Sequence, residues 1–233
     1  MNLKQKVQAE KFYFILGGIF IACLVSGNLI FQKFFSWDFF NSYTFELSVG
    51  ILPYPLTFLI TDLISEIYGR KRANFVVVSG FVATFFIFLL VLLADAVPAT
   101  DWSPVNDETF SSVFGLTGAA VTASMVAYLL AQFVDIRIYH YWKRKTNGKH
   151  LWLRNNFSTI TSQLVDTASV LLLLCAFGSI EWARFGDLLA NGFLYKLFIA
   201  LIDTPILYLL VYLAKRKFGL ANNEEIPFEG EEE

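Results

Sequence analysis

Residues 53–72 read PYPLTFLITDLISEIYGRKR, an apolar segment that carries two carboxylates. It is long and apolar enough to enter a membrane, and it stops at Gly69 and the basic triplet 70–72. Two carboxylates, Asp62 and Glu66, lie four residues apart, so a helix places them on one face about one turn from each other. Because a charge that faces lipid is costly, we expect this pair to face a polar cavity or a partner helix.

The composition of the chain indicates a membrane protein. Of its 233 residues 56% are hydrophobic, whereas soluble domains average about 45–50%. The excess comes in blocks of roughly 20 residues, the length that crosses about 30 Å of hydrocarbon. We expect six such spans, at about 12–32, 45–68, 73–95, 111–136, 157–179 and 187–214. The predicted fold is therefore an all-α, polytopic bundle of six transmembrane helices that forms one domain over 1–233.

The basic residues predict the orientation of the chain. Three Lys or Arg residues precede the first span, three follow the second, six follow the fourth and three follow the sixth. The other three loops carry one, none and one. By the positive-inside rule, both termini are predicted to be cytoplasmic. The acidic end of the chain, 218–233, is expected to be a solvated cytoplasmic tail.

Several classes of function are disfavoured. The net charge of −2 gives no overall field for a nucleic-acid partner. The sequence has no phosphate-binding loop, metal-type Cys spacing or nucleophile elbow, so we expect no cofactor and no bound metal. An enzyme that used Asp62 and Glu66 as acid and base would also need a nucleophile or metal beside them, so none is expected. His140 and His150 fall in a basic loop, where we expect them to be solvated.

Further polar residues lie within the predicted spans. Gln163 and Asp166 are three residues apart and share a helix face. Lys196 is the one plainly intramembrane base, and we expect it to pair inside the bundle, with Asp203 or Asp166, rather than to extend to the interface. The candidate binding residues are Asn28, Asp62, Glu66, Asn155, Asn156, Gln163, Asp166, Lys196 and Asp203.

Asp135, at the end of the fourth predicted span, has two open roles: a local pair with Arg137 or the basic loop, and a contact with a ligand. The remaining excess of acids over bases favours a cationic or donor-rich ligand, or proton coupling. Carboxylates and amides on facing helices also suit a flat heterocycle, because they match its donors and acceptors while aromatic rings stack on its faces. We expect Asp62, Glu66, Gln163 and Asp166 to line one polar cavity between the second and fifth spans.

Three separated motifs resemble those of the queuosine-precursor transporters, a vitamin-uptake family. The first is PLTFLITDLISEIYG at 55–69, and the second is RNNFST at 154–159 with the later pairs Ser162-Gln163 and Asp166-Thr167. The third is Lys196 with the triplet DTP at 203–205. The motifs occur in the family's order and cover nearly the whole chain.

The resemblance implies import of 7-cyano-7-deazaguanine or a related 7-deazapurine across the bacterial inner membrane, for salvage into tRNA modification. Two classes of transport protein remain possible from the sequence. One is a self-sufficient secondary transporter in the lipid bilayer, with a homodimer as an open assembly state; the other is the substrate-binding subunit of an energy-coupling-factor type importer with a separate ATPase module. A scaffold is disfavoured, because it does not need so many intramembrane acids.

The implied substrate suggests which residue recognises it. A 7-deazaguanine presents N1–H and a 2-amino group side by side, and a carboxylate can accept from both without presenting a competing donor. We expect Asp166 or Glu66 to be this residue, because each has polar neighbours on its own helix face.

Overall fold

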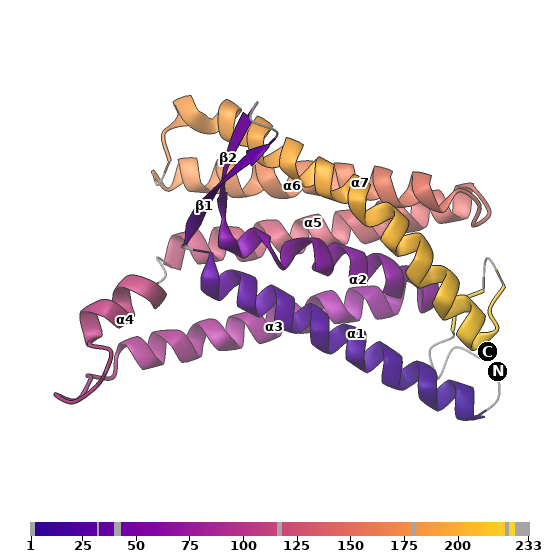
Figure 1. Cartoon of the computed structure of the whole chain (residues 1–233), viewed down its shortest axis with the longest axis horizontal. Coiled ribbons are helices and arrows are strands. Elements are labelled where there is room, and N and C mark those ends of the chain that lie inside the picture. The colour runs from indigo at the N-terminus through magenta and orange to yellow at the C-terminus, as the bar shows by residue number, and fades with distance from the viewer. Residues whose placement is uncertain are drawn as a thin grey trace.

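Long helices make up most of the protein and pack side by side in an elongated bundle (Figure 1). The computed structural model describes residues 3–31, 33–39, 43–115, 118–178, 180–221 and 224–226. The α-helices of these ranges are α1 (Leu3–Ile30), α2 (Tyr54–Ile67), α3 (Gly69–Asp95), α4 (Asp107–Phe114), α5 (Gly118–Lys145), α6 (Leu151–Ala176) and α7 (Phe185–Phe218). Two short 3-10 helices, η1 (Val49–Ile51) and η2 (Trp182–Arg184), precede α2 and α7.

Five helical segments of the described residues are long and apolar enough to cross a membrane. They are Leu3–Ile30, Val49–Ile67, Gly69–Asp95, Leu151–Ala176 and Trp182–Phe218. The all-α, polytopic membrane fold is thereby confirmed. α5 has the length of a span, 28 residues, but is not one of the five, so the number of six spans remains a prediction.

The two ends of the bundle differ in what they carry. The start of α1 and the end of α7 lie at one end, which we call the terminal end, and a β-hairpin and α4 lie at the other, the hairpin end (Figure 1). α2 occupies the middle, in contact with α1, α3, α5 and α7. Every residue from 57 to 67 is buried, as expected for a helix surrounded by other helices. The outer helices instead expose large apolar side chains such as Phe75 and Phe86, which suit a lipid environment.

The predicted second span, 45–68, was wrong at its start, where the structure has a β-hairpin. β1 (Phe34–Phe39) pairs antiparallel with β2 (Tyr43–Ser48), and Trp37 stacks on its cross-strand partner Phe45 with 5.9 Å between ring centroids. Residues 45–48 are therefore strand, and α2 begins only at Tyr54. The prolines on either side of Tyr54 explain this start, because proline is tolerated in the first turn of a helix and not in its interior.

The predicted fourth span, 111–136, is also displaced. α4 ends at Phe114, and α5 continues nine residues beyond 136, to Lys145. The extension is stable because its inward-facing side chains, including Tyr139 and His140, are buried in the bundle. The expectation that His140 is solvated was thus wrong, whereas His150, in the following turn, is exposed. The other four predicted spans overlap α1, α3, α6 and α7. Each of these helices begins before the apolar segment that was predicted for it.

Gly50, in η1, packs directly against α1. A Cβ atom built on Gly50 would lie 2.6 Å from the carbonyl oxygen of Gly27 and 2.8 Å from Cβ of Phe31. Real Cβ atoms do not approach a backbone oxygen so closely. The absence of a side chain therefore lets η1 lie against α1 at the hairpin end.

We predict that Gly50→Ala destabilises the protein by about 1–3 kcal/mol, because the methyl group must displace backbone atoms of α1. The measurement is thermal unfolding of the purified protein in detergent. Gly18→Ala is the matched control, since a Cβ atom at Gly18 meets nothing within 4 Å. Equal melting temperatures for the two variants would contradict the proposed close packing.

Candidate functional site

A cavity of about 340 Å³ lies in the bundle toward the hairpin end, near the start of α2. Its volume falls in the range of small-molecule sites, about 300–1,000 Å³. Residues of α1, β2, η1, α2, α3, α5, α6 and α7 line it, so it forms only when these elements are assembled. Its polar and aromatic lining residues include Asn28, Phe31, Ser48, Tyr54, Thr57, Thr84, Ser124, Tyr128, Asp166 and Lys196.

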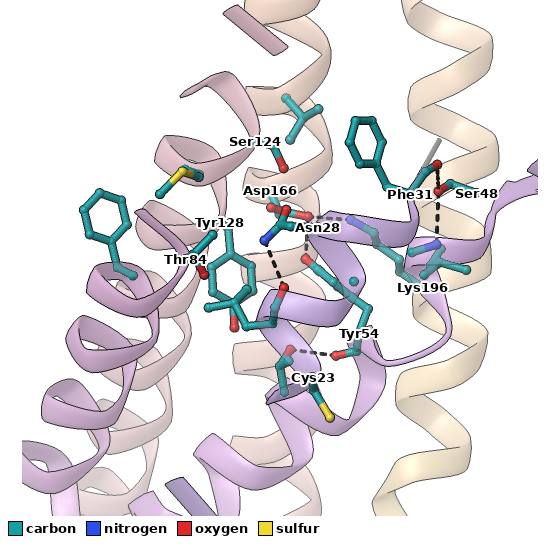
Figure 2. Close-up of a pocket in the computed structure, with 18 of the residues that line it drawn as sticks. Cys23, Asn28, Phe31, Ser48, Tyr54, Thr84, Ser124, Tyr128, Asp166 and Lys196 are labelled. Atoms are coloured by element: carbon teal, nitrogen blue, oxygen red, sulfur yellow. Dashed lines mark hydrogen bonds and ion pairs between the residues drawn. The ribbon is translucent and has the colours of Figure 1, made fainter. Parts of the chain in front are cut away.

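An ion pair between Asp166 and Lys196 is the charged feature of this cavity (Figure 2). Lys196 Nζ lies 2.5 Å from Asp166 Oδ2 and 3.1 Å from Thr167 Oγ1. The hydroxyl of Tyr54 also donates a hydrogen bond to Asp166 Oδ2, and the Lys196 ammonium lies 4.6 Å from the centroid of the Tyr54 ring. The prediction that Lys196 pairs inside the bundle is confirmed, with Asp166 rather than Asp203 as the partner.

Aromatic rings form one wall beside this pair. The Tyr54 ring lies 5.2 Å from the Phe58 ring and 6.2 Å from the Tyr128 ring. Gln132 holds the Tyr128 hydroxyl in place by donating a 2.7 Å hydrogen bond to it. The cavity therefore combines fixed aromatic surfaces with one carboxylate and one ammonium group.

Glu66 lies outside this cavity, in a cluster of opposite charges at the terminal end. Its side chain is 1% exposed, and its oxygens contact Arg154 at 2.7 Å, Lys215 at 2.6 Å and Lys143 at 3.5 Å. Tyr139 adds a 3.0 Å hydrogen bond. Three cations on α5, α6 and α7 thus meet one carboxylate of α2, which indicates a structural role for Glu66.

Residues 224–226 join this cluster. Glu225 pairs with Lys143 at 2.7 Å, and the backbone N–H of Ile226 donates to the carbonyl oxygen of Ile67 at 2.8 Å. Lys143 also donates to the Glu66 carbonyl oxygen at 3.2 Å, at the carboxyl end of α2. The expected solvated tail, 218–233, is therefore wrong for this part, because Ile226 is buried; 222–223 and 227–233 lie outside the described residues.

Asp62 and Asp135 lie between the cavity and the Glu66 cluster. Their side chains are 2% and 0% exposed, and their carboxyl groups lie next to each other. Ser162 Oγ donates to Asp135 Oδ1 at 2.9 Å. Of the two roles left open for Asp135, the local pair with Arg137 is not found, because Arg137 is exposed on the opposite side of α5.

The structure therefore divides the predicted site residues among separate places. Asn28, Asp166 and Lys196 line the large cavity. Gln163 and Asp203 line a much smaller pocket of about 20 Å³, which shares Tyr54 and Lys196 with the large one. The prediction of one cavity for Asp62, Glu66, Gln163 and Asp166 was wrong, because helix faces shared by two residues do not place them at the same depth.

Asn155 and Asn156 connect two helices. Asn155 Nδ2 donates to Thr204 Oγ1 at 3.2 Å, and the Thr204 hydroxyl lies 3.1 Å from Asn156 Oδ1. The pair thus joins α6 to α7 near Pro205, where proline removes a backbone hydrogen bond from α7. Neither asparagine lines either of these two cavities.

Sequence reasoning missed Tyr54 and Tyr128 in the cavity and Lys143, Arg154 and Lys215 in the Glu66 cluster. Arg154 could have been found, because it opens one of the motifs and immediately precedes a predicted span. Tyr54 had the weaker signal of an aromatic residue between two prolines. Tyr128 had none, because an aromatic residue in a membrane helix most often packs against lipid or another helix.

Comparisons with known proteins give a consistent picture. A family model described as "Putative vitamin uptake transporter" matches residues 48–210. A relative from Bacillus subtilis (strain 168), named "Probable queuosine precursor transporter", is 28% identical over 167 residues, which are 69% of this chain and 70% of the relative. A relative of the same name from Haemophilus influenzae is 26% identical over 196 residues, which are 80% of this chain and 78% of the relative. No solved structure matches significantly.

The Glu66 cluster generates a prediction about stability. Glu66→Gln should lower the free energy of unfolding by about 3–5 kcal/mol, because it leaves buried cations without their counter-charge. Thermal unfolding in detergent measures the effect. Glu181→Gln, the same change at an exposed site, is the control and should melt like the wild type. An unchanged melting temperature for Glu66→Gln would show that the cluster does not hold the helices together.

Proposed function

Because the chain belongs to the vitamin uptake transporter family, whose model covers most of it, we propose that it imports 7-deazaguanine precursors of queuosine. The substrate class follows the name of the two relatives, and 7-cyano-7-deazaguanine is the specific compound we propose. The observation that carries the proposal is the cavity in which Asp166 and Lys196 lie beside aromatic rings. This combination suits a flat base with adjacent acceptor and donor groups.

Asp166 is suited to accept hydrogen bonds from the base. Lys196 and Tyr54 both contact Oδ2, so Oδ1 is left for a ligand. An ionised carboxylate only accepts hydrogen bonds, so it presents no competing donor to the base. N1–H or the 2-amino group of a deazaguanine can therefore donate to Oδ1 of Asp166, while its 6-carbonyl oxygen, next to N1, can accept from Lys196.

Other groups complete the recognition that we propose. Asn28 donates its amide N–H to the Leu24 carbonyl oxygen at 3.0 Å, which leaves its own carbonyl oxygen for a donor on the base. Tyr54, Tyr128 and Phe31 offer rings for stacking, which is worth about 1–3 kcal/mol per base. Glu66 is less suited than Asp166, because cations occupy both of its oxygens.

The remaining candidates support the site from further away. We place Gln163 and Asp203 at its edge, because their small pocket shares Tyr54 and Lys196 with the large cavity. Asp62 lies deeper in the bundle, and Asn155 and Asn156 hold α7 against α6. These five residues are therefore proposed to shape the transport path rather than to bind the base first.

The proposed direction is inward. In the bacterial inner membrane, with both termini cytoplasmic as the basic loops predict, the hairpin end faces outward. The cavity then lies on the outer side, while the Glu66 cluster and residues 224–226 close the inner side. This arrangement suits an outward-facing carrier whose binding site is accessible to substrate from outside.

Asp166→Asn should weaken uptake of 7-cyano-7-deazaguanine tenfold to a hundredfold at limiting substrate. The amide presents an N–H to the N–H groups of the base, a mismatch of about 1–3 kcal/mol at about 1.4 kcal/mol per decade. The measurement is queuosine in tRNA, in cells that lack their own transporter and queuosine synthesis. Asp187→Asn, at an exposed position of α7, is the matched control. Normal uptake by Asp166→Asn at wild-type protein level would refute this assignment.

A second measurement separates the two classes of machine. The purified protein, reconstituted alone in liposomes, should exchange external labelled 7-cyano-7-deazaguanine for internal unlabelled base, because we propose a self-sufficient secondary transporter. A substrate-binding subunit of an energy-coupling-factor importer would bind the base in the same preparation and fail to move it. Binding without exchange would therefore favour the alternative.

A further inference from the structure

Buried polar residues continue from the cavity toward the terminal end. On α5 they recur every three or four residues, so Tyr128, Gln132, Asp135 and Tyr139 share one face. Tyr128 lines the cavity and Tyr139 contacts Glu66, so this face joins the two sites. The residues between them, Gln132 and Asp135, are both fully buried. A polar column therefore crosses the interior of the bundle.

The middle of this column is a pair of carboxyl groups, Asp62 from α2 and Asp135 from α5. The two carboxyl groups lie next to each other, and in the described part of the chain no cation forms an ion pair with either. Arg154 on α6 and Asp203 on α7 also act electrostatically on Asp62, and Glu66 lies one turn further along α2. Arg154 itself is held by Glu66 at 2.7 Å.

An ionised carboxylate can only accept hydrogen bonds, so two adjacent carboxyl groups can bond to each other only through a shared proton. Two unpaired negative charges side by side in a buried site are strongly unfavourable, so binding one proton relieves their repulsion. Ser162 donates to Asp135 and so stabilises the charge that remains.

Unsatisfied atoms around the pair point to a mobile ligand. Asp62 Oδ1, Asp135 Oδ2 and Gln132 Oε1 are buried and have no hydrogen-bond partner. Gln132 lies one turn from Asp135 on the shared face, and its Nε2 donates to the Tyr128 hydroxyl at the cavity wall. These oxygens are acceptors without a donor. A proton, or a water molecule that carries one, would supply the missing donor.

We propose that Asp62 and Asp135 form the proton-binding site through which transport is coupled to a proton gradient. This inference rests on the proposed function, because it supplies the driving force for the same carrier. A proton arriving as hydronium from the hairpin end breaks its O–H bond to water and forms one on a carboxylate, so two anions become one. On the opposite side the carboxyl O–H bond breaks and the proton passes to water.

The charge change explains why proton and substrate would move together. With the proton bound, the pair carries one negative charge, so the two carboxyl groups can stay together between α2 and α5. Without the proton, repulsion between two adjacent carboxylates favours separation of the helices that carry them. The closed arrangement of these helices also shapes the cavity wall, through Tyr54 and Tyr128.

The test uses the full-length protein in liposomes, with 7-cyano-7-deazaguanine and a pH-sensitive dye trapped inside. For the wild type we expect accumulation above the external concentration when the outside is acidic, its collapse with a protonophore, and internal acidification on addition of the base. Asp62→Asn and Asp135→Asn should each reduce the accumulation and the acidification at least tenfold. Asp135→Asn should still exchange labelled for unlabelled base, since Asp135 does not line the cavity.

Asp187→Asn is again the matched control and should behave like the wild type. Full gradient-driven accumulation by either variant of the pair would overturn the inference. Wild-type exchange without substrate-dependent acidification would also overturn it, and this result does not depend on how the variants fold. Absence of exchange by the wild type is a different outcome, because it contradicts the proposed function itself.

Discussion

A single carboxylate, Glu66, collects cations from three other helices at the terminal end of the bundle. A charge buried at 1% exposure is tolerated only when its partners are in place, so α5, α6 and α7 must all assemble around α2. Helices are stiff, and their positions at one end constrain their positions at the other. The cavity near Tyr54 therefore depends on an ionic contact about three turns away along the same helix.

The two ends of the bundle are filled in opposite ways. At the terminal end, charges, backbone groups and residues 224–226 close the space between helices. At the hairpin end, aromatic rings and one ion pair surround a cavity. A carrier needs this asymmetry, because it must expose its site to one side at a time. The Asp62–Asp135 pair lies between the two ends, where a change of charge can affect both.

The functional residues differ in how far they could be predicted. Pairing of Lys196 followed from the cost of an isolated charge in hydrocarbon, and the structure confirms it. Glu66 was correctly singled out as needing a partner, but its cations come from loops and helix ends that were assigned to the membrane surface. Asp135 was placed at the interface because basic residues follow it, whereas α5 continues to Lys145 and keeps it buried.

The sequence by itself determined that this chain is an apolar helical bundle of the vitamin uptake transporter family. Hydropathy and the cost of buried charge act residue by residue, so they can be read along the chain. Only the tertiary structure decided that Asp166 lines the cavity, that Asp62 meets Asp135 and that Glu66 meets three cations. These contacts depend on the rotation and depth of each helix against its neighbours, which long-range packing sets and local sequence does not encode.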